Sequence, residues 1–414
     1  MAPPAIAALA LAPFIIWKIV RMLLAYRGDT SDATRSYALK HFTQADIDTG
    51  KTHTQPYYLP GLANYALDLV FLWALIFLGL ANRIEGIARS ITSILPLQVG
   101  CFLVIFNAVT IAIFAPLTCY TGYVLGRRLG KLKQTFREWL WFNLKEMGIG
   151  FALTWLIFSI FEATVRHVPG LWWLIVGSVL TLFMLLMIFI QPIILAPIFY
   201  KFTRLEDGPL RDRLLEICRK AGVAARDVFV QHESKVTTET NAYFTGIGKT
   251  KRIVLYDNLL NANSPDEIAV VVAHEAGHWR RRHVLFFICL SVAAAYAGSY
   301  LLFRLFQIYA VRQFLGTSVD RLSILPLLSL LGVIVSTFFD PAAAAISRVL
   351  ERHADRDSLD LTNDPAAFIS MDVKLVRSNK TDILPHPLLE KLYASHPGTL
   401  ERIRYAEERS AEKA

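Results

Sequence analysis

The sequence is poor in cysteine and in charge for its length. Only four of its 414 residues are cysteines, and only 19% are charged. The cysteines are scattered, which excludes a disulfide framework and a C-x-x-C metal pair. They are Cys101, Cys119, Cys218 and Cys289. We also find no nucleic-acid-binding motif, internal repeat or low-complexity tract, so we expect no nucleic-acid partner although the net charge is +9.

Apolar residues dominate the composition instead. They make up 54% of the chain, and the mean hydropathy of +0.41 indicates a multi-pass membrane protein. Seven apolar runs are long enough to cross a hydrocarbon core of about 30 Å. They cover residues 3–26, 61–81, 99–117, 149–165, 171–198, 284–303 and 322–345.

The distribution of basic residues predicts how these spans are oriented. The first and third loops between the runs are rich in lysine and arginine, whereas the second, fourth and sixth carry fewer cations. The first run has no basic residues ahead of it, which favours an uncleaved helix with its N-terminus outside. Excess cations mark cytoplasmic loops, so we expect the odd-numbered loops and the C-terminus to face the cytoplasm.

Two polar segments are large enough to fold outside the membrane. Within the first, DVFVQH, TNAYFTGIG and KRIVLYD read as strands, at residues 227–232, 240–248 and 251–257. The second is mostly helical in pattern, and both lie on the predicted inner side, so they can meet there. The predicted division is 1–198 for spans one to five, 199–283 for the first cytoplasmic segment, 284–345 for spans six and seven, and 346–414 for the second cytoplasmic segment.

The stretch NSPDEIAVVVAHEAGHW begins with the signature of a helix N-terminus. Ser264 can cap the helix, and Pro265 suits the first helical position. Glu267 follows the cap by three residues, which completes a capping box. We therefore expect a helix that begins here and continues through the two histidines of the stretch.

Those two histidines form a metal-binding motif. His274 and His278 are four residues apart, so a helix presents them on one face. With Glu275 they make H-E-x-x-H, in which two neutral imidazoles bind Zn²⁺ and the glutamate takes a proton from the attacking water. A motif this short also occurs by accident, so a third ligand is needed to support the metal site.

The third ligand is predicted downstream, in SRVLERHADRDSLD. Glu351 and Asp355 are four residues apart and share a helix face. Zinc peptidases use this E-x-x-x-D spacing for a glutamate that binds the metal and an aspartate that accepts a hydrogen bond from a ligand histidine. By itself such a face is more often a solvated surface. Together with H-E-x-x-H on the same side of the membrane, it predicts a site with one Zn²⁺ per chain.

His283 is a weaker candidate for the third ligand. It follows His278 by five residues, which turns it away from the metal face of a continuous helix. The metzincin continuation also fails, since the chain has Arg281 and Val284 where that pattern needs glycine and histidine. We expect the helix to continue through residues 280–282 into the sixth span, with His283 at the membrane interface.

Five stretches resemble the type I CAAX prenyl protease family of seven-span zinc endopeptidases. They are LAPIFYKFTRLEDGPLRDRLLEI, TNAYFTGIGKTKRIVLYDNLL, VVAHEAGHW, ERHADRDSL and ASHPGTLERI. The resemblance extends over nearly the whole chain. It implies that Asn241, Ala242 and Tyr243 lie in an edge strand that pairs with the substrate backbone. It also implies that His396 and Arg402 reach the active site, where His396 stabilises the oxyanion and Arg402 binds substrate.

The expected fold is therefore a mainly α membrane protein. About seven transmembrane helices enclose a cavity, and a small α+β zinc metallopeptidase domain lies on the cytoplasmic side. The chain lacks the long insertions of eukaryotic relatives, which favours a bacterial inner membrane over the endoplasmic reticulum. The expected partners are the lipid bilayer and a peptide or protein substrate. A C-terminal prenyl group on that substrate is one of the two alternatives that the sequence leaves open.

The expected function is zinc-dependent hydrolysis of peptide bonds near the C-terminus of prenylated or otherwise membrane-associated substrates. Glu275 serves as the base, and Asp355 orients a ligand imidazole. One alternative is a quality-control protease for membrane proteins with no prenyl requirement. A site-2-type protease would need an L-D-G motif, which we do not find. A non-catalytic channel or scaffold has no need for the intact Glu275.

Overall fold

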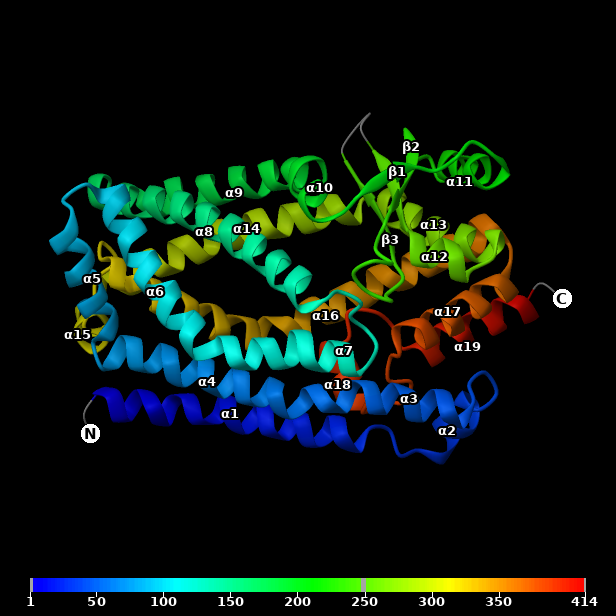
Figure 1. The fold of residues 1–414 in the computed structure, drawn as a ribbon, viewed down its shortest axis with the longest axis horizontal. Coiled ribbons are helices and arrows are strands. Elements are labelled where there is room, and N and C mark those ends of the chain that lie inside the picture. Colours follow the sequence, from blue (N-terminus) through cyan, green and yellow to red (C-terminus); the bar gives the residue numbers. More distant parts are fainter. Residues whose placement is uncertain (1–2, 247–250, 413–414) are drawn as a thin grey trace.

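The computed structural model describes residues 3–246 and 251–412 and is built mainly from helices (Figure 1). The helices of the first half are α1 (Pro3–Arg27), α2 (Asp32–Ala38), α3 (Gln44–Thr54), α4 (Tyr58–Phe77), α5 (Leu80–Ile91), α6 (Leu95–Thr118), α7 (Gly126–Arg128), α8 (Phe136–His167), α9 (Trp172–Ile190) and α10 (Ala196–Phe199). Those of the second half are α11 (Pro209–Lys220), α12 (Asp257–Ala262), α13 (Pro265–Arg280), α14 (His283–Gln307), α15 (Tyr309–Leu315), α16 (Leu325–Thr362), α17 (Pro365–Asn379), α18 (Pro387–Tyr393) and α19 (Thr399–Ala411). The strands are β1 (Phe202–Arg204), β2 (Asp227–Gln231), β3 (Ala242–Thr245) and β4 (Arg252–Tyr256).

Within the described residues, seven helical stretches are long and apolar enough to cross a membrane, which confirms the seven predicted spans. They are Pro4–Arg27, Gln44–Phe77, Leu95–Arg128, Phe136–His167, Trp172–Phe199, His283–Gln307 and Leu322–Thr362. Most are longer than the apolar run that predicted them, because polar residues continue the helix past the membrane. The end of the second span differs from the prediction. Helix α4 ends at Phe77, since Gly79 takes a left-handed backbone with a φ of 69° and starts the separate helix α5.

The long helices gather at one end of the molecule, and the sheet with α11, α12, α13, α17 and α19 gathers at the other (Figure 1). Helix α16 joins the two parts. Its 38 residues make it about 57 Å long at 1.5 Å per residue, and it runs unbroken through residue 345, where a segment boundary was predicted. The same helix therefore belongs to the membrane bundle at its start and to the soluble part at its end.

The sheet of the described chain has four strands in the order β1-β2-β4-β3. β2 and β4 are parallel, while β1 and β3 are antiparallel to their neighbours. The three predicted strands correspond to β2, β3 and β4, although residues 247–248 of the predicted middle strand lie outside the described residues. β1 was not predicted, since three residues are too few for a recognisable alternation. β3 pairs only with β4 and lies at an edge of the sheet.

A hydrophobic core holds the sheet against α11 and α13. Ile253 and Leu255 of β4 are fully buried, and they pack with Leu214 of α11 and with Ile268 and Val272 of α13. Burial of such side chains stabilises the fold by about 1.5–3 kcal/mol each. The core therefore fixes α13, which carries the predicted metal-binding motif, against the back of β4, next to the edge strand.

The structure corrects the prediction that the motif helix continues into the sixth span. Helix α13 ends at Arg280, and Arg282 has a left-handed backbone with a φ of 58° before α14 begins at His283. Such a conformation costs a non-glycine residue about 1–2 kcal/mol, and no glycine or proline announces the break. The turn was therefore invisible in the sequence.

Substitutions at Arg282 should report on this turn. We expect Arg282→Gly to keep or slightly raise the thermal unfolding midpoint, because glycine adopts positive φ without steric cost. Arg282→Val should lower the midpoint, since a β-branched residue is a genuine outlier at this backbone conformation. Thermal-shift measurements in detergent would compare the two variants. Equal midpoints for the glycine and valine variants would contradict a strained left-handed residue at this position.

Candidate metal centre

Helix α13 begins at the predicted capping box. The Ser264 hydroxyl accepts a hydrogen bond from the Glu267 amide at 3.3 Å, and the Glu267 carboxylate accepts one from the Ser264 amide at 2.7 Å. The same carboxylate is bound by the Ser370 hydroxyl at 2.6 Å and by the Lys374 ammonium at 2.8 Å. The cap thus also fixes the start of α13 to α17.

Close packing of α13 on α16 brings the two predicted halves of the site together. A Cβ atom at Gly277 would lie 3.1 Å from the Ala354 Cα, so a larger residue here would push the two helices apart by a few tenths of an ångström. The Ser358 hydroxyl donates to the Val270 carbonyl at 2.8 Å across the same contact. Motif residues of α13 therefore face the residues of α16 that the E-x-x-x-D spacing singled out.

Three potential ligand atoms converge at this contact. The His274 Nε2 and His278 Nε2 atoms are 3.2 Å apart. The Glu351 carboxylate lies 3.1 Å from the first and 3.4 Å from the second. Among the described residues, His274, His278 and Glu351 form the one group of this kind that could hold a metal ion. The three residues proposed as metal ligands from the sequence are thus adjacent in space.

Asp355 lies behind His274, on the side away from these ligand atoms. The His274 Nδ1 atom is 2.9 Å from the Asp355 carboxylate, which is almost fully buried. A carboxylate at this position accepts a hydrogen bond from Nδ1–H, which keeps the proton on Nδ1 and leaves the Nε2 lone pair free for a metal. The orienting role that the sequence suggested for Asp355 requires such a contact, and the role itself stays a prediction.

Arg402 holds this aspartate in place. Its Nε and Nη2 atoms donate to the two Asp355 oxygens at 3.0 and 2.8 Å, and its Nη1 atom donates to Asp372. Burial by itself would lower the pKa of Arg402, but the two carboxylates raise it, so the guanidinium stays charged. These contacts differ from the expectation of a substrate-binding residue. Arg402 lines the cavity but is bonded to two buried carboxylates, one of which, Asp355, also contacts His274.

His283 is the first residue of the sixth candidate span, and its predicted place at the membrane interface stays a prediction. Its side chain is only 4% exposed, and its Nδ1 atom lies 2.9 Å from the His278 Nδ1 atom. The left-handed turn at Arg282 brings His283 back beside the His278 ring, which a continuous helix would not do. His283 contacts a predicted ligand from behind and is not itself one of the three converging groups.

A cavity of about 1100 Å³ opens beside the three converging groups. Glu275 lines it next to His274, with its side chain half-buried. Burial raises the pKa of Glu275, partly offset by the neighbouring imidazoles. A carboxylate with a raised pKa, facing a cavity beside a metal-binding group, is suited to accept and release a proton.

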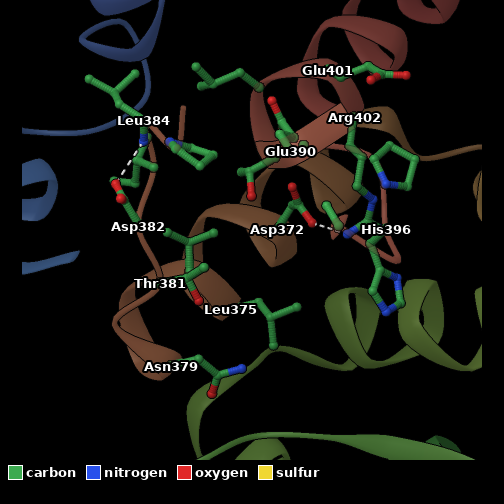
Figure 2. A pocket seen from close by; sticks show the side chains of 18 of the residues that line it. Asp372, Leu375, Asn379, Thr381, Asp382, Leu384, Glu390, His396, Glu401 and Arg402 are labelled. Carbon is green, nitrogen blue, oxygen red and sulfur yellow. Dashed lines mark hydrogen bonds and ion pairs between the residues drawn. The ribbon is translucent and has the colours of Figure 1, made fainter. Parts of the chain in front are cut away.

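His396 reaches the same place from the loop between α18 and α19. Its Nδ1 atom is 2.8 Å from the Glu351 carboxylate, and its side chain is 64% exposed. The loop is anchored by Arg348 of α16, whose guanidinium donates to the carbonyls of Lys391 and Ala394, both at 2.6 Å. Figure 2 shows His396 and Arg402 on one wall of the cavity, across from Thr381 and Asp382.

Edge strand β3 borders the cavity on its other side. Asn241 and Ala242 line the cavity. The Tyr243 side chain turns away, as strand alternation requires, and its hydroxyl donates to Gln231 at 2.9 Å. The backbone edge of β3 is thus next to the metal-binding group, whereas the partly buried Tyr243 ring packs beside Tyr256 and bonds Gln231 of the same sheet.

Sequence reasoning did not single out Asp372 and Arg348, which both shape the site, and it did not predict that His283 contacts His278. Asp372 is 1% exposed and bonded to Arg402. Burial raises the pKa of its carboxyl group, while Arg402 opposes that rise. An acidic residue in the apolar stretch FISMDVKLV was the one available signal for Asp372.

Comparisons with known proteins agree with this geometry. The model of peptidase family M48 matches residues 204–410, and a model described as the CAAX prenyl protease N-terminal region with five membrane helices matches residues 35–201. The uncharacterized metalloprotease YhfN of Bacillus subtilis is 29% identical over 345 residues, which cover 82% of this chain and 80% of that protein. CAAX prenyl protease 1 of Saccharomyces cerevisiae is 30% identical over 329 residues, covering 73% and 70%. The crystal structure of S. mikatae Ste24p has a TM-score of 0.85 at 22% identity and covers 98% of this chain and 99% of that one.

Proposed function

Because the chain belongs to peptidase family M48 as a member of the CAAX prenyl protease family, we propose that it is an integral-membrane zinc endopeptidase. Family membership makes it a multi-pass membrane metalloprotease, hence a peptide hydrolase. We further propose that it cuts peptide bonds near the C-terminus of prenylated or otherwise membrane-associated substrates.

The converging side chains fit a zinc ion. Ligand atoms about 2.0–2.1 Å from a tetrahedral metal lie about 3.3 Å from one another. The two Nε2 atoms are 3.2 Å apart, one Glu351 oxygen lies 3.1 Å from the His274 Nε2 atom and the other lies 3.4 Å from the His278 Nε2 atom, so each contact is close to this spacing. Two imidazoles and one carboxylate also form the ligand set of catalytic zinc sites that keep a fourth position open. We therefore assign these three residues as the ligands of one Zn²⁺ per chain.

The proposed reaction is the addition of water to a scissile carbonyl. A bound Zn²⁺ supplies Lewis acidity, which polarises the carbonyl and lets water react at neutral pH. Glu275 accepts the proton that the water loses and then passes it to the nitrogen of the leaving amine. Burial raises the pKa of Glu275, which makes its carboxylate a better acceptor for the proton that the water loses.

Other residues hold the substrate and stabilise charge. An extended peptide can add to the free edge of β3, where Asn241 and Ala242 border the cavity. His396 extends from an anchored loop toward the ligand group, and it can donate a hydrogen bond to the oxygen that becomes negative. In this proposal Tyr243 supports the strand through its bond to Gln231.

We assign the protein to a bacterial inner membrane, or to the endoplasmic reticulum if its source is eukaryotic, with the site on the cytoplasmic side. The basic first and third loops support this orientation. The site lies at the end of the membrane bundle, since helix α16 carries both apolar membrane residues and Glu351. A substrate held by a lipid chain can thus reach it without leaving the membrane surface.

The convergence of three ligand atoms beside Glu275 at the edge of the membrane bundle carries this proposal. It is tested with the purified protein, a farnesylated C-a-a-X peptide and its unmodified twin. We expect one zinc per chain by metal analysis, and cleavage near the C-terminus of the farnesylated peptide, seen by mass spectrometry, at a higher rate than for the twin. Equal cleavage of both peptides would favour the quality-control alternative, and zinc-loaded protein that cuts neither would overturn the proposal.

A further inference from the structure

The two proposed histidine ligands differ in what lies behind them. His274 has the Asp355 carboxylate at its Nδ1 atom at 2.9 Å. His278 has another imidazole there, that of His283, also at 2.9 Å between the two Nδ1 atoms. The rings of His278 and His283 meet edge to face, with an interplanar angle of 71°. The Nδ1 atom of His274 therefore faces a carboxylate, whereas the Nδ1 atom of His278 faces an imidazole.

The chain places His283 there by a local conformation and not by helical spacing. In a continuous helix, a residue five positions after His278 would point away from the metal face. The left-handed backbone of Arg282, with a φ of 58°, ends α13 and reverses that displacement. A strained residue beside a functional group is often kept because the surrounding structure needs the geometry.

The pairing of two Nδ1 atoms restricts the protonation of both rings. One nitrogen must carry a hydrogen and the other must offer its lone pair. If His278 uses Nε2 for the metal, its proton must be on Nδ1, so His278 is the donor. His283 is then the acceptor, neutral and protonated on Nε2. The reverse arrangement would put a proton on the His278 Nε2 atom, where it would block metal binding.

We propose that His283 is a positioning residue that selects the metal-binding tautomer of His278 and fixes the orientation of its ring. This inference rests on the proposed metal site. His283 performs for His278 what Asp355 performs for His274, without adding another negative charge beside those of Glu351 and Asp355. Outer partners of this kind change metal affinity by about 10- to 100-fold when they are replaced.

Two amide variants test the proposal, because they differ only in where they place an acceptor. The Oδ1 atom of asparagine can occupy the place of the histidine Nδ1, whereas the glutamine Oε1 corresponds to Nε2. We expect His283→Asn to bind Zn²⁺ within a few-fold of the native affinity. His283→Gln and His283→Leu should bind it about 10- to 100-fold more weakly, as measured by competition with a chelator.

Cobalt provides a readout that does not depend on activity. We expect the visible absorption of the Co²⁺-loaded His283→Gln protein to shift relative to the native and His283→Asn proteins, because a rotated His278 changes the ligand field. The matched control is His353→Leu, whose exposed ring lies 6.1 Å from the His283 ring and should leave affinity and spectrum unchanged. Thermal unfolding of the metal-free variants checks that each one folds.

The outcomes separate this inference from the proposed function. If the native protein binds no zinc or cobalt, the metal site itself is wrong. If the native protein binds metal and the glutamine and asparagine variants match each other in affinity and spectrum, the positioning role of His283 is overturned. A loss confined to the variants without an Nδ1-like acceptor supports it.

Discussion

Replacement of Glu275 by glutamine should lower kcat for peptide hydrolysis by about 10²- to 10⁴-fold. Glutamine keeps the size and polarity of the side chain but cannot accept a proton. Since Glu275 is not among the three converging ligand groups, the zinc content of the variant should equal that of the native protein. A chelator should stop hydrolysis by the native protein, and added zinc should restore it.

The matched control for this experiment is Glu216→Gln. Glu216 is exposed on α11 and pairs with Lys220 at 3.2 Å, far from the cavity lining, so its replacement should change neither kcat nor metal content. Metal analysis and peptide cleavage are measured on the same preparations. Full zinc content combined with undiminished hydrolysis in the Glu275→Gln protein would remove Glu275 as the base.

Replacement of Arg402 by leucine should destabilise the soluble part by about 3–5 kcal/mol. The substitution leaves the carboxylates of Asp355 and Asp372 buried without their common cation, and both are at most 2% exposed. For a folded unit of about 150 residues, this corresponds to a thermal midpoint lower by about 6–20 °C. The variant should also lose zinc affinity, because Asp355 no longer holds His274 in place.

Two further variants show whether unpaired charge is the cause. Adding Asp372→Asn to Arg402→Leu should recover part of the lost midpoint, since one buried charge is removed. Arg409→Leu on the same helix, α19, should shift the midpoint less, because the side chain of its partner Asp360 is 40% exposed and exposed pairs contribute little. If Arg402→Leu and Arg409→Leu had equal midpoints, the buried network would not stabilise the fold as argued.

Features that depend on neighbouring residues were predictable from the sequence. The seven spans follow from apolar runs of sufficient length, and the capping box at Ser264 follows from residue types at fixed offsets. The pairs His274–His278 and Glu351–Asp355 were each proposed from a four-residue spacing, since one helical turn places such residues on a common face. The side of the membrane and the role of each site residue remain predictions.

Other features depend on contacts between residues far apart in the chain. Asp355 and Arg402 are 47 residues apart, and the sequence gives no reason why a guanidinium of α19 should bind a carboxylate of α16 and not a substrate. Predicting that pairing requires knowing how α16, α17 and α19 pack, which depends on the whole core.

The sequence alone thus determined the membrane spans, the zinc-type motif and the helix that carries it, because these are set by hydropathy and by 3.6-residue periodicity within single segments. Only the tertiary structure decided that Arg402 supports Asp355, that Tyr243 turns into the sheet and that His283 lies behind His278. The last case shows the physical reason most simply. The left-handed backbone of Arg282 changes the direction of the chain and places the His283 side chain against the His278 ring. Helical periodicity does not extend across such a turn, so the sequence could not predict this contact.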